Sequence, residues 1–257
     1  MAKQPHLLVS DGELADVALL PGDPGRVDRI ADACDDATVV SANREYKVVN
    51  ATYKGRELSI CSTGIGCPSA AIAVEELSAV GVDTVLRVGT TGALQSGIEI
   101  GDMVVATAAA KDEGTTGRYE SDTVPAAADY RVLSALVDAA ESREGSVADR
   151  PASGDGAVSG GSVHVGPIAT DDAFYAETDA YVRDWEAAGL LAVEMEAAAI
   201  FSLARRKGLR AGAICTVDGN LVEGTQKGET DAEELPEKAK NNVERAIAIA
   251  LDAAATL

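Results

Sequence analysis

The sequence predicts an α/β protein made of one domain, residues 1–257, in which helices flank a mixed central β-sheet. Three observations predict this class: the alternation of segments, the absence of a repeat, and the chain length. Strand-like and helix-like segments alternate along the whole chain. The sequence shows no repeat of fixed period, which argues against a repeat protein. A chain of 257 residues can also bury one sizeable core, and nothing in its length demands a second domain.

The first part of the chain predicts a strand, a helix, a hairpin, a helix and two strands. β-Branched residues on either side of Lys54–Gly55 indicate the hairpin. Apolar residues at helical spacing, with Pro68 in the first turn, indicate the second helix. In order, we expect a strand at 17–20, a helix after the turn PGDPGR, a hairpin of 46–53 and 56–61, a helix at 68–80, and strands at 84–89 and 101–109.

The second part of the chain continues the alternation after one break. Residues 145–161 are poor in apolar residues and rich in Gly, Ser and Asp, which predicts a mobile surface loop. Gly208 is expected to end a helix that begins near residue 192. The other expected elements are helices at 129–140, 178–189 and 235–255 and strands at 162–170 and 210–217.

The charge balance excludes two classes of partner. The net charge is −20, from 42 acidic against 22 basic residues, which argues against binding nucleic acid or anionic membranes. The acidic residues are dispersed, and Lys is scarce, with 8 against 14 Arg. Such a surface is typical of a halophilic protein, because high salt screens its self-repulsion. The alternative is an ordinary acidic enzyme.

The hydropathy pattern points to a soluble protein of the cytoplasm, and the histidines and cysteines argue against metal sites and disulfides. No run of eighteen apolar residues and no basic-then-apolar leader is visible. The two histidines, His6 and His164, are too few for a His-rich metal site. The four cysteines form no CxxC pair, so we expect buried thiols rather than disulfides or a zinc site; they are Cys34, Cys61, Cys67 and Cys215.

Glycine and arginine occur together at three expected strand ends, in LLPGDPGR, LRVGTTGA and SANREYK. Arg87 lies within a buried-looking strand and cannot lose its proton, so it needs an anionic partner. Arg26, Arg44, the Thr90 hydroxyl and glycine backbone N–H groups complete a set suited to phosphate. The alternative is that each Arg pairs with an acidic residue.

Two carboxylates flank one methionine in LLAVEMEAAAIFSLA. A carboxylate can accept from two neighbouring hydroxyls, which suits a ribose diol, and Met195 offers a soft apolar surface. At the start of the expected helix, Glu194 and Glu196 would lie about 200° apart and could not share a face. One would then line a pocket while the other caps the helix or is solvated. The alternative is that both are first-turn acids stabilised by the helix dipole.

Several motifs, in a fixed order from about residue 6 to residue 220, resemble the nucleoside phosphorylase family. They most resemble its uridine phosphorylase and hexameric purine nucleoside phosphorylase branch. The motifs are GDPGR, STGIGCPSAAIAVEEL, LRVGTTGALQ, GDMVVATAA, HVGPIATDDAFY, VEMEAAAIFSLA and LRAGAICTV. The resemblance implies a pentosyltransferase of nucleoside catabolism and salvage. Phosphate would attack the sugar reversibly, giving free base and ribose 1-phosphate, with no cofactor.

The resemblance also implies a role for individual residues. It places phosphate at Gly22, Arg26, Arg87 and Thr90, with Arg44 reaching in from a neighbouring subunit. It places ribose at Glu194, Met195 and Glu196, with His6 of the neighbour at the 5′-hydroxyl. Arg87, Glu196 and Arg26 would be the catalytic residues. It further implies a dimer-based homohexamer with shared sites, and a potassium-like monovalent cation near Glu45, Ile65 and Ser69.

The base-binding end departs from both branches of the family. Phe174 would pack on the base. Where the uridine enzymes carry a Gln and an Arg after FY, the matching positions here are Thr178 and Ala180. Where the purine enzymes carry an Asp that protonates the purine N7, this chain has Gly219, with Asp218 one step earlier. STGIG, VEEL and VGTTGA favour uridine phosphorylase, and a purine nucleoside phosphorylase is the alternative.

Two further classes are weighed against a phosphorylase. A related nucleosidase would use water and would not need an Arg-lined phosphate site, so Arg26 and Arg87 argue against it. A non-catalytic nucleoside-binding protein would have no reason to combine a phosphate set with a ribose set. We therefore expect small-molecule substrates, a nucleoside and inorganic phosphate.

Overall fold

The computed structural model describes residues 3–144, 147–148, 162–225 and 237–257. The strands are β1 (Val17–Pro21), β2 (Asp36–Asn43), β3 (Tyr46–Tyr53), β4 (Arg56–Cys61), β5 (Thr84–Ala93), β6 (Met103–Asp112), β7 (Ala126–Ala127), β8 (Val147–Ala148), β9 (Val163–Asp171), β10 (Ala192–Glu194) and β11 (Arg210–Asn220). The helices are α1 (Pro24–Asp32), α2 (Cys67–Ala79), α3 (Tyr130–Glu144), α4 (Asp179–Ala187), α5 (Ala197–Lys207) and α6 (Glu237–Ala254).

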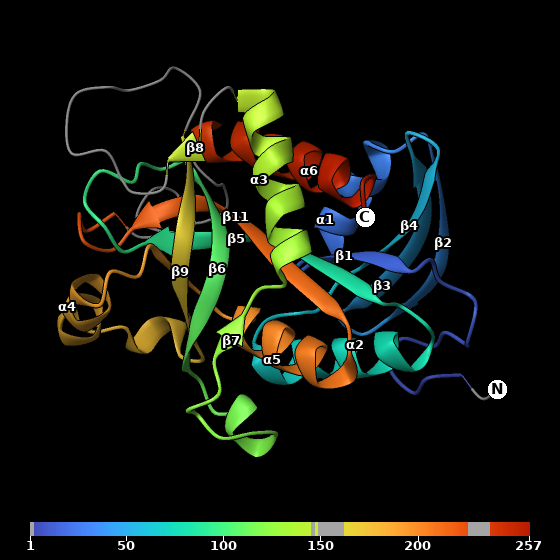
Figure 1. Cartoon of the computed structure of the whole chain (residues 1–257), viewed down its shortest axis with the longest axis horizontal. Coiled ribbons are helices and arrows are strands. Elements are labelled where there is room, and N and C mark those ends of the chain that lie inside the picture. Colours follow the sequence, from blue (N-terminus) through green and yellow to red (C-terminus); the bar gives the residue numbers. More distant parts are fainter. Residues whose placement is uncertain (1–2, 145–146, 149–161, 226–236) are drawn as a thin grey trace.

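One mixed sheet joins all of these strands in the order β10-β9-β6-β11-β5-β1-β4-β3-β2, with β7 and β8 paired at β6 and β9. Helices α2 and α5 pack on one face, and α1, α3 and α6 pack on the other (Figure 1). The central strand β1 is buried at every position, because both of its faces are covered. The predicted class, helices on both sides of a mixed sheet, is confirmed.

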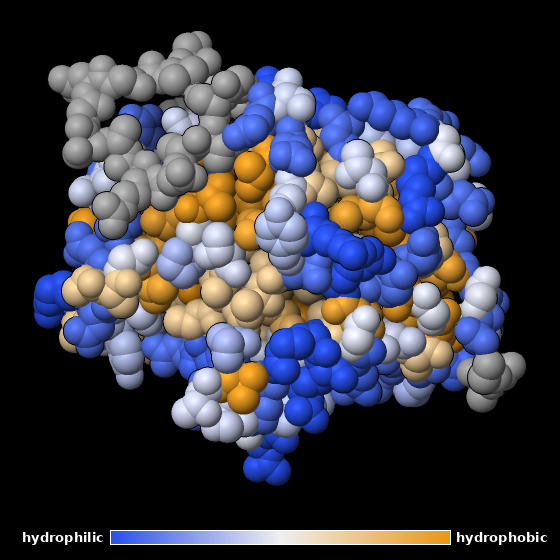
Figure 2. Space-filling view, viewed as in Figure 1, coloured by the Kyte–Doolittle hydropathy of each residue, from blue (hydrophilic) through white to orange (hydrophobic). Residues whose placement is uncertain are grey.

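The alternating apolar faces of β1 show how the core is divided. Ala18 and Leu20 belong to the cluster that packs on α2 and α5, whereas Val17 and Leu19 belong to the cluster that packs on α1 and α6. Figure 2 shows hydrophilic side chains over much of the outer surface, with apolar residues visible over β6 and β9. No helix in the described ranges is long and apolar enough to cross a membrane.

Most expected elements form close to their predicted bounds. Tyr53 pairs with Arg56 across a turn in which Lys54 and Gly55 both have positive φ, so the predicted hairpin is confirmed. Gly208, with φ 78°, ends α5 as expected. Strand β2 was not predicted, because most of its side chains are exposed and it lies at the sheet edge. All four cysteines are free, and Cys34 alone among them is partly exposed.

The expected helix at 192–208 is wrong at its beginning. Residues Ala192–Glu194 form β10, which pairs parallel with β9 and antiparallel with the end of β5. The helix α5 begins only at Ala197. Pairing with two neighbouring strands overrides the helical preference of the Ala- and Glu-rich sequence. The predicted loop at 145–161 lies outside the described residues except for β8.

Candidate active site

A cavity opens where four neighbouring strands end. Strands β4, β1, β5 and β11 run parallel in this order, so their carboxyl ends meet at one edge of the sheet. In open α/β sheets such an edge is where ligands bind. The cavity has a volume of about 1520 Å³. Because drug-sized ligands occupy pockets of roughly 300–1,000 Å³, it has room for two small molecules side by side.

Backbone hydrogen bonds join the loops after β1 and β4 and fix one wall of the cavity. The Gly64 N–H donates to the Gly22 carbonyl at 2.9 Å, and the Thr63 N–H donates to the Pro21 carbonyl at 2.9 Å. Gly64 has φ +72°, and a Cβ there would lie 2.6 Å from Ser69 Oγ. This position therefore requires glycine.

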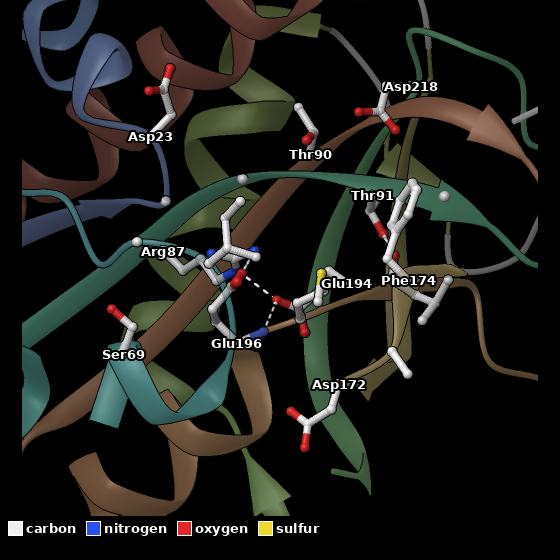
Figure 3. A pocket seen from close by; sticks show the side chains of 18 of the residues that line it. Asp23, Ser69, Arg87, Thr90, Thr91, Asp172, Phe174, Glu194, Glu196 and Asp218 are labelled. Atoms are coloured by element: carbon white, nitrogen blue, oxygen red, sulfur yellow. Dashed lines mark hydrogen bonds and ion pairs between the residues drawn. The ribbon is translucent and has the colours of Figure 1, made fainter. Parts of the chain in front are cut away.

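Arg87, on β5, is the buried cation at the floor of the cavity. Its side chain is 4% exposed and forms ion pairs with two carboxylates (Figure 3). Arg87 Nε lies 2.7 Å from Glu194 Oε2, and Nη2 contacts Glu196 Oε2. Burial acts to lower the pKa of Arg87, but Glu196 and Glu194 outweigh it and raise the pKa. The sequence-based expectation that Arg87 needs an anionic partner is confirmed, and two partners meet it.

Glu194 is locked in place by four groups. Its carboxylate accepts from the Thr170 hydroxyl at 2.6 Å and from the backbone N–H groups of Glu196 and Ala197 at 2.9 and 3.0 Å, besides pairing with Arg87. Buried carboxylates of this kind are stable only when so many donors surround them. Glu194 thus fixes both the start of α5 and the orientation of Arg87.

Glu196 lies beside Glu194 in the same site, so the prediction that the two could not share one face is wrong. Its physical basis, a helix through both residues, does not hold, because Glu194 ends β10 and Glu196 precedes α5. Glu196 Oε1 accepts from the Gly66 N–H at 2.5 Å. Burial raises the pKa of Glu196, and Arg87 acts against this. Neither carboxylate is a solvated first-turn acid, since both are 4% exposed.

Arg26, from the first turn of α1, lies close to Arg87, and no carboxylate of the described residues forms an ion pair with it. Within the described part of the chain, its side chain donates one hydrogen bond, from Nη1 to the Val88 carbonyl at 3.2 Å. Burial and the nearby Arg87 lower the pKa of Arg26. Arg26 Nε and Arg87 Nη1 are buried and have no hydrogen-bond partner among the described residues. Guanidinium N–H groups without a partner, on two residues that both line the cavity, favour an anion there.

The remaining residues of the predicted phosphate and ribose sets divide into two groups. Gly22, Thr90 and Met195 line the cavity together with both arginines and both glutamates. Arg44 and His6 do not line it. Arg44 is exposed in the turn between β2 and β3 with φ 55°, rather than at a strand start. The His6 ring lies 2.6 Å from Glu76 Oε1.

Arg44 and His6 nevertheless belong to one surface. The side chain of Asn43 donates to the His6 carbonyl at 2.8 Å, which ties the amino-terminal segment to the turn that carries Arg44. The other histidine, His164, is buried and pairs with Asp102 at 2.9 Å. No histidine of the described chain lines the cavity, so a His-based triad has no place there.

Three of the four predicted base-binding residues line the cavity: Phe174, Asp218 and Gly219. Figure 3 shows Phe174 and Asp218 on the side of the cavity away from Arg87. Phe174 comes from a short 3-10 helix after β9. Thr178 is not part of the cavity lining, and its hydroxyl accepts from the Tyr181 N–H to cap α4. Its predicted contact with the base therefore has no support in this arrangement.

A β-bulge aims Asp218 at the cavity. The pairing of β11 with β5 runs from Val217 opposite Thr91 directly to Gly219 opposite Gly92, which leaves Asp218 as the extra residue. Bulges re-aim side chains in this way and are common beside active sites. Asp218 is 6% exposed, and it lines the cavity.

The predicted cation set also meets at the cavity rim. Ser69 Oγ lies 3.1 Å from Glu45 Oε1 and 2.5 Å from the Thr63 carbonyl oxygen, and its single O–H can donate to one of them at a time. Ile65 is 78% exposed beside them. Carboxylate, hydroxyl and carbonyl oxygens are ligands that hard cations accept. Binding of a monovalent cation here stays a prediction.

Glu177 is one of the cavity residues that sequence reasoning missed. It lines the cavity three residues after Phe174. Burial, with a contribution from the nearby Asp171 carboxylate, raises the pKa of Glu177 to about 7. The sequence signal for Glu177 was its position between Tyr175 and Thr178, beside the positions that match the uridine enzymes' Gln and Arg.

Comparisons with known proteins agree with this geometry. Residues 16–255 match the model of the phosphorylase superfamily. A guanosine phosphorylase of Halorubrum lacusprofundi is 64% identical over 257 residues, which is all of both chains. A uridine phosphorylase of Thermococcus kodakarensis is 41% identical over 89% of this chain and 82% of its own. The crystal structure of uridine phosphorylase from Vibrio fischeri superposes with a TM-score of 0.85 at 32% identity, covering 100% of this chain and 99% of its own.

Proposed function

The chain belongs to the phosphorylase superfamily and is a nucleoside phosphorylase, and from this premise we propose that its substrate is a purine nucleoside, guanosine first. The motif comparison favoured uridine. The 64% identity to a guanosine phosphorylase, against 41% to a uridine phosphorylase, supports the purine alternative better. The products would be free guanine and ribose 1-phosphate.

The observation that carries the phosphorolytic reaction is the pair of unsatisfied donors, Arg26 Nε and Arg87 Nη1. A phosphate dianion held between them, with the Thr90 hydroxyl at the same wall, would lie under the anomeric carbon of a bound nucleoside. Positioning of this kind lowers the barrier by removing the freedom of the two reactants. The phosphate charge also stabilises the positive charge that develops on the sugar.

The ribose is proposed to lie on Met195, with its 2′- and 3′-hydroxyls donating to Glu196. Each carboxylate oxygen has two lone pairs, so Glu196 can accept from the sugar while it keeps its bond from Gly66. Glu194 contacts no substrate in this scheme. It orients Arg87 and holds the backbone from which Glu196 projects.

Asp218 is proposed as the proton donor to the base. As phosphate oxygen forms its bond to the anomeric carbon, the bond from that carbon to N9 breaks and electrons flow into the purine. A proton passed from the Asp218 carboxyl to N7 lets the base leave uncharged. General acid catalysis of this kind contributes typically about 10²- to 10⁴-fold.

The Asp218→Asn variant tests this role. We expect kcat for guanosine to fall by about 10²- to 10⁴-fold, because the amide cannot give up a proton. A matched substrate serves as the control. 7-Methylguanosine already carries a positive charge on its imidazole ring and needs no proton at N7, so the variant should cleave it nearly as well as the native enzyme does. Equal losses on both nucleosides would contradict the assignment.

The experiment that tests the base assignment is a comparison of kcat/KM in phosphate for guanosine, inosine, adenosine, uridine and thymidine. The proposal predicts that guanosine and inosine are cleaved best. A clear preference for uridine would overturn it and return the assignment to the branch that the motifs favoured.

A further inference from the structure

Glu177 is a carboxylate of the cavity that the reaction scheme does not use. Every other acidic residue that lines the cavity has a hydrogen bond or another interaction: Asp23, Glu45, Asp172, Glu194, Glu196 and Asp218. Glu177 has no hydrogen bond and no ion pair among the described residues. It is also half-buried, so solvent does not fully replace a partner.

The position of Glu177 is at the base end. It directly follows the short helix Phe174–Ala176, and Figure 3 draws Phe174 and Asp218 on the same side of the cavity, away from Arg87. The proposed phosphate ligands Arg26 and Arg87 come from other elements, the first turn of α1 and the middle of β5. In the proposed scheme Asp218 contacts N7 on the imidazole ring of the purine. The opposite, Watson–Crick edge of the base would then face the loop that carries Phe174. Of that loop's other cavity residues, Asp172 is already engaged by the Gly114 N–H at 2.9 Å.

The chemistry of the carboxylate selects among base edges. An ionised carboxylate offers two parallel acceptors and no donor. Guanine presents two adjacent donors on one edge, N1–H and the 2-amino group. Adenine presents an acceptor at N1, and uracil presents one N–H between two carbonyl oxygens, which a second carboxylate oxygen would repel. Two acceptors therefore fit guanine alone of the three.

We propose that Glu177 is the specificity-determining residue that reads the N1–H and 2-amino donors of guanine. This inference rests on the proposed purine phosphorylase function and deepens it. Burial and Asp171 raise the pKa of Glu177 to about 7, so the ionised form is costly in the empty cavity. Two donors from the base relieve that cost, since hydrogen bonds to charged groups are about twice as strong as neutral ones.

The Glu177→Gln variant tests the proposal. The amide replaces one acceptor by a donor, which clashes with guanine and matches the N1 and 6-amino groups of adenine. We expect kcat/KM for guanosine to fall by about 10- to 100-fold, as for a lost hydrogen bond to a charged group. Inosine, which lacks the 2-amino group, should lose less, and adenosine should lose nothing or gain.

Asp179→Asn is the matched control, because Asp179 lies two residues further on, exposed in the first turn of α4 and outside the cavity. It should leave the ratio of guanosine to adenosine unchanged. Because Glu177 has no partner to lose among the described residues, the melting temperature of Glu177→Gln should equal or exceed that of the native enzyme.

The pH dependence gives a second readout. In the native enzyme the ratio of kcat/KM for guanosine to that for adenosine should rise as the pH passes through about 7. The sign follows because loss of the Glu177 proton creates the second acceptor for guanine and removes the donor that suits adenine N1. The other carboxylates at this end of the cavity are Asp171, Asp172 and Asp218. Phosphate also titrates in this range, but it affects both nucleosides alike, so its effect cancels in the ratio of the two kcat/KM values. The ratio for Glu177→Gln should be flat.

The outcomes separate the two claims. If the native enzyme cleaves no purine nucleoside in phosphate, the proposed function fails and this inference fails with it. If the native enzyme prefers guanosine and Glu177→Gln keeps both that preference and its pH dependence, only the inference is overturned. Loss of the preference in Glu177→Gln, with Asp179→Asn unchanged, supports it.

Discussion

Replacement of Arg26 by Met is expected to lower kcat/KM for phosphate by about 10²- to 10³-fold, the size of the loss of one preorganised electrostatic contact, about 2.7–4 kcal/mol. Among the described residues no carboxylate pairs with the Arg26 guanidinium, and its buried Nε has no hydrogen-bond partner. Methionine keeps much of the apolar stem, so the substitution removes mainly charge and donors. Steady-state kinetics with varied phosphate at saturating nucleoside measure the effect.

Arg26 is a cleaner test than Arg87. Removing Arg87 would leave Glu194 and Glu196 buried without their cation, and breaking a buried pair in this way costs about 3–5 kcal/mol of stability. The matched control is Arg29→Met, since Arg29 lies on the same helix and pairs with Glu244 at the surface. We expect Arg29→Met to leave kcat/KM for phosphate unchanged. Equal effects of the two substitutions would show that Arg26 does not contact phosphate.

The Arg44→Ala and Glu196→Ala variants are each expected to be nearly inactive alone and to recover activity when mixed. Arg44 and His6 lie on one surface outside the cavity of their own subunit. In a two-fold dimer each subunit lends the same patch to the other. For random pairing, half the dimers are mixed and each has one intact site, so about a quarter of the native sites should return.

A second mixture is the negative control for recovery of activity by subunit exchange. Arg26→Met and Glu196→Ala both alter residues that line the cavity of their own subunit. A mixed dimer of these two has no intact site, so mixing them should restore nothing beyond the residual activity of each. If the Arg44→Ala mixture also restores nothing while tagged subunits exchange, Arg44 does not complete a neighbour's site.

The sequence predicted the fold and much of the cavity, because apolar periodicity and Gly-rich strand ends are local signals. The need of Arg87 for an anion followed from burial and charge alone, and Glu194 and Glu196 meet it. The predictions that were wrong concern geometry that depends on pairing between strands far apart in the sequence. The strand β10 forms because β9 and β5 offer hydrogen bonds 20 to 100 residues away along the chain, and no local pattern reveals this.

The base end was least predictable for the same reason. The bulge that turns Asp218 toward the cavity exists only in the register of β11 against β5. Glu177 was not predicted, because its proposed role rests on a carboxylate without a hydrogen-bond or ion-pair partner among the described residues. A sequence does not show which side chains pair. The roles of Arg44 and His6 depend on a second subunit, and the halophilic character rests on charge composition, so these stay predictions.

The most direct test of the account is the dependence of base release on phosphate. Purified enzyme, freed of phosphate by exchange into a phosphate-free buffer, would be incubated with guanosine with and without inorganic phosphate, and guanine and ribose 1-phosphate would both be quantified. The account predicts negligible guanine release without phosphate and, with it, equal amounts of guanine and ribose 1-phosphate. Guanine release at the same rate without phosphate, with free ribose as the product, would contradict it.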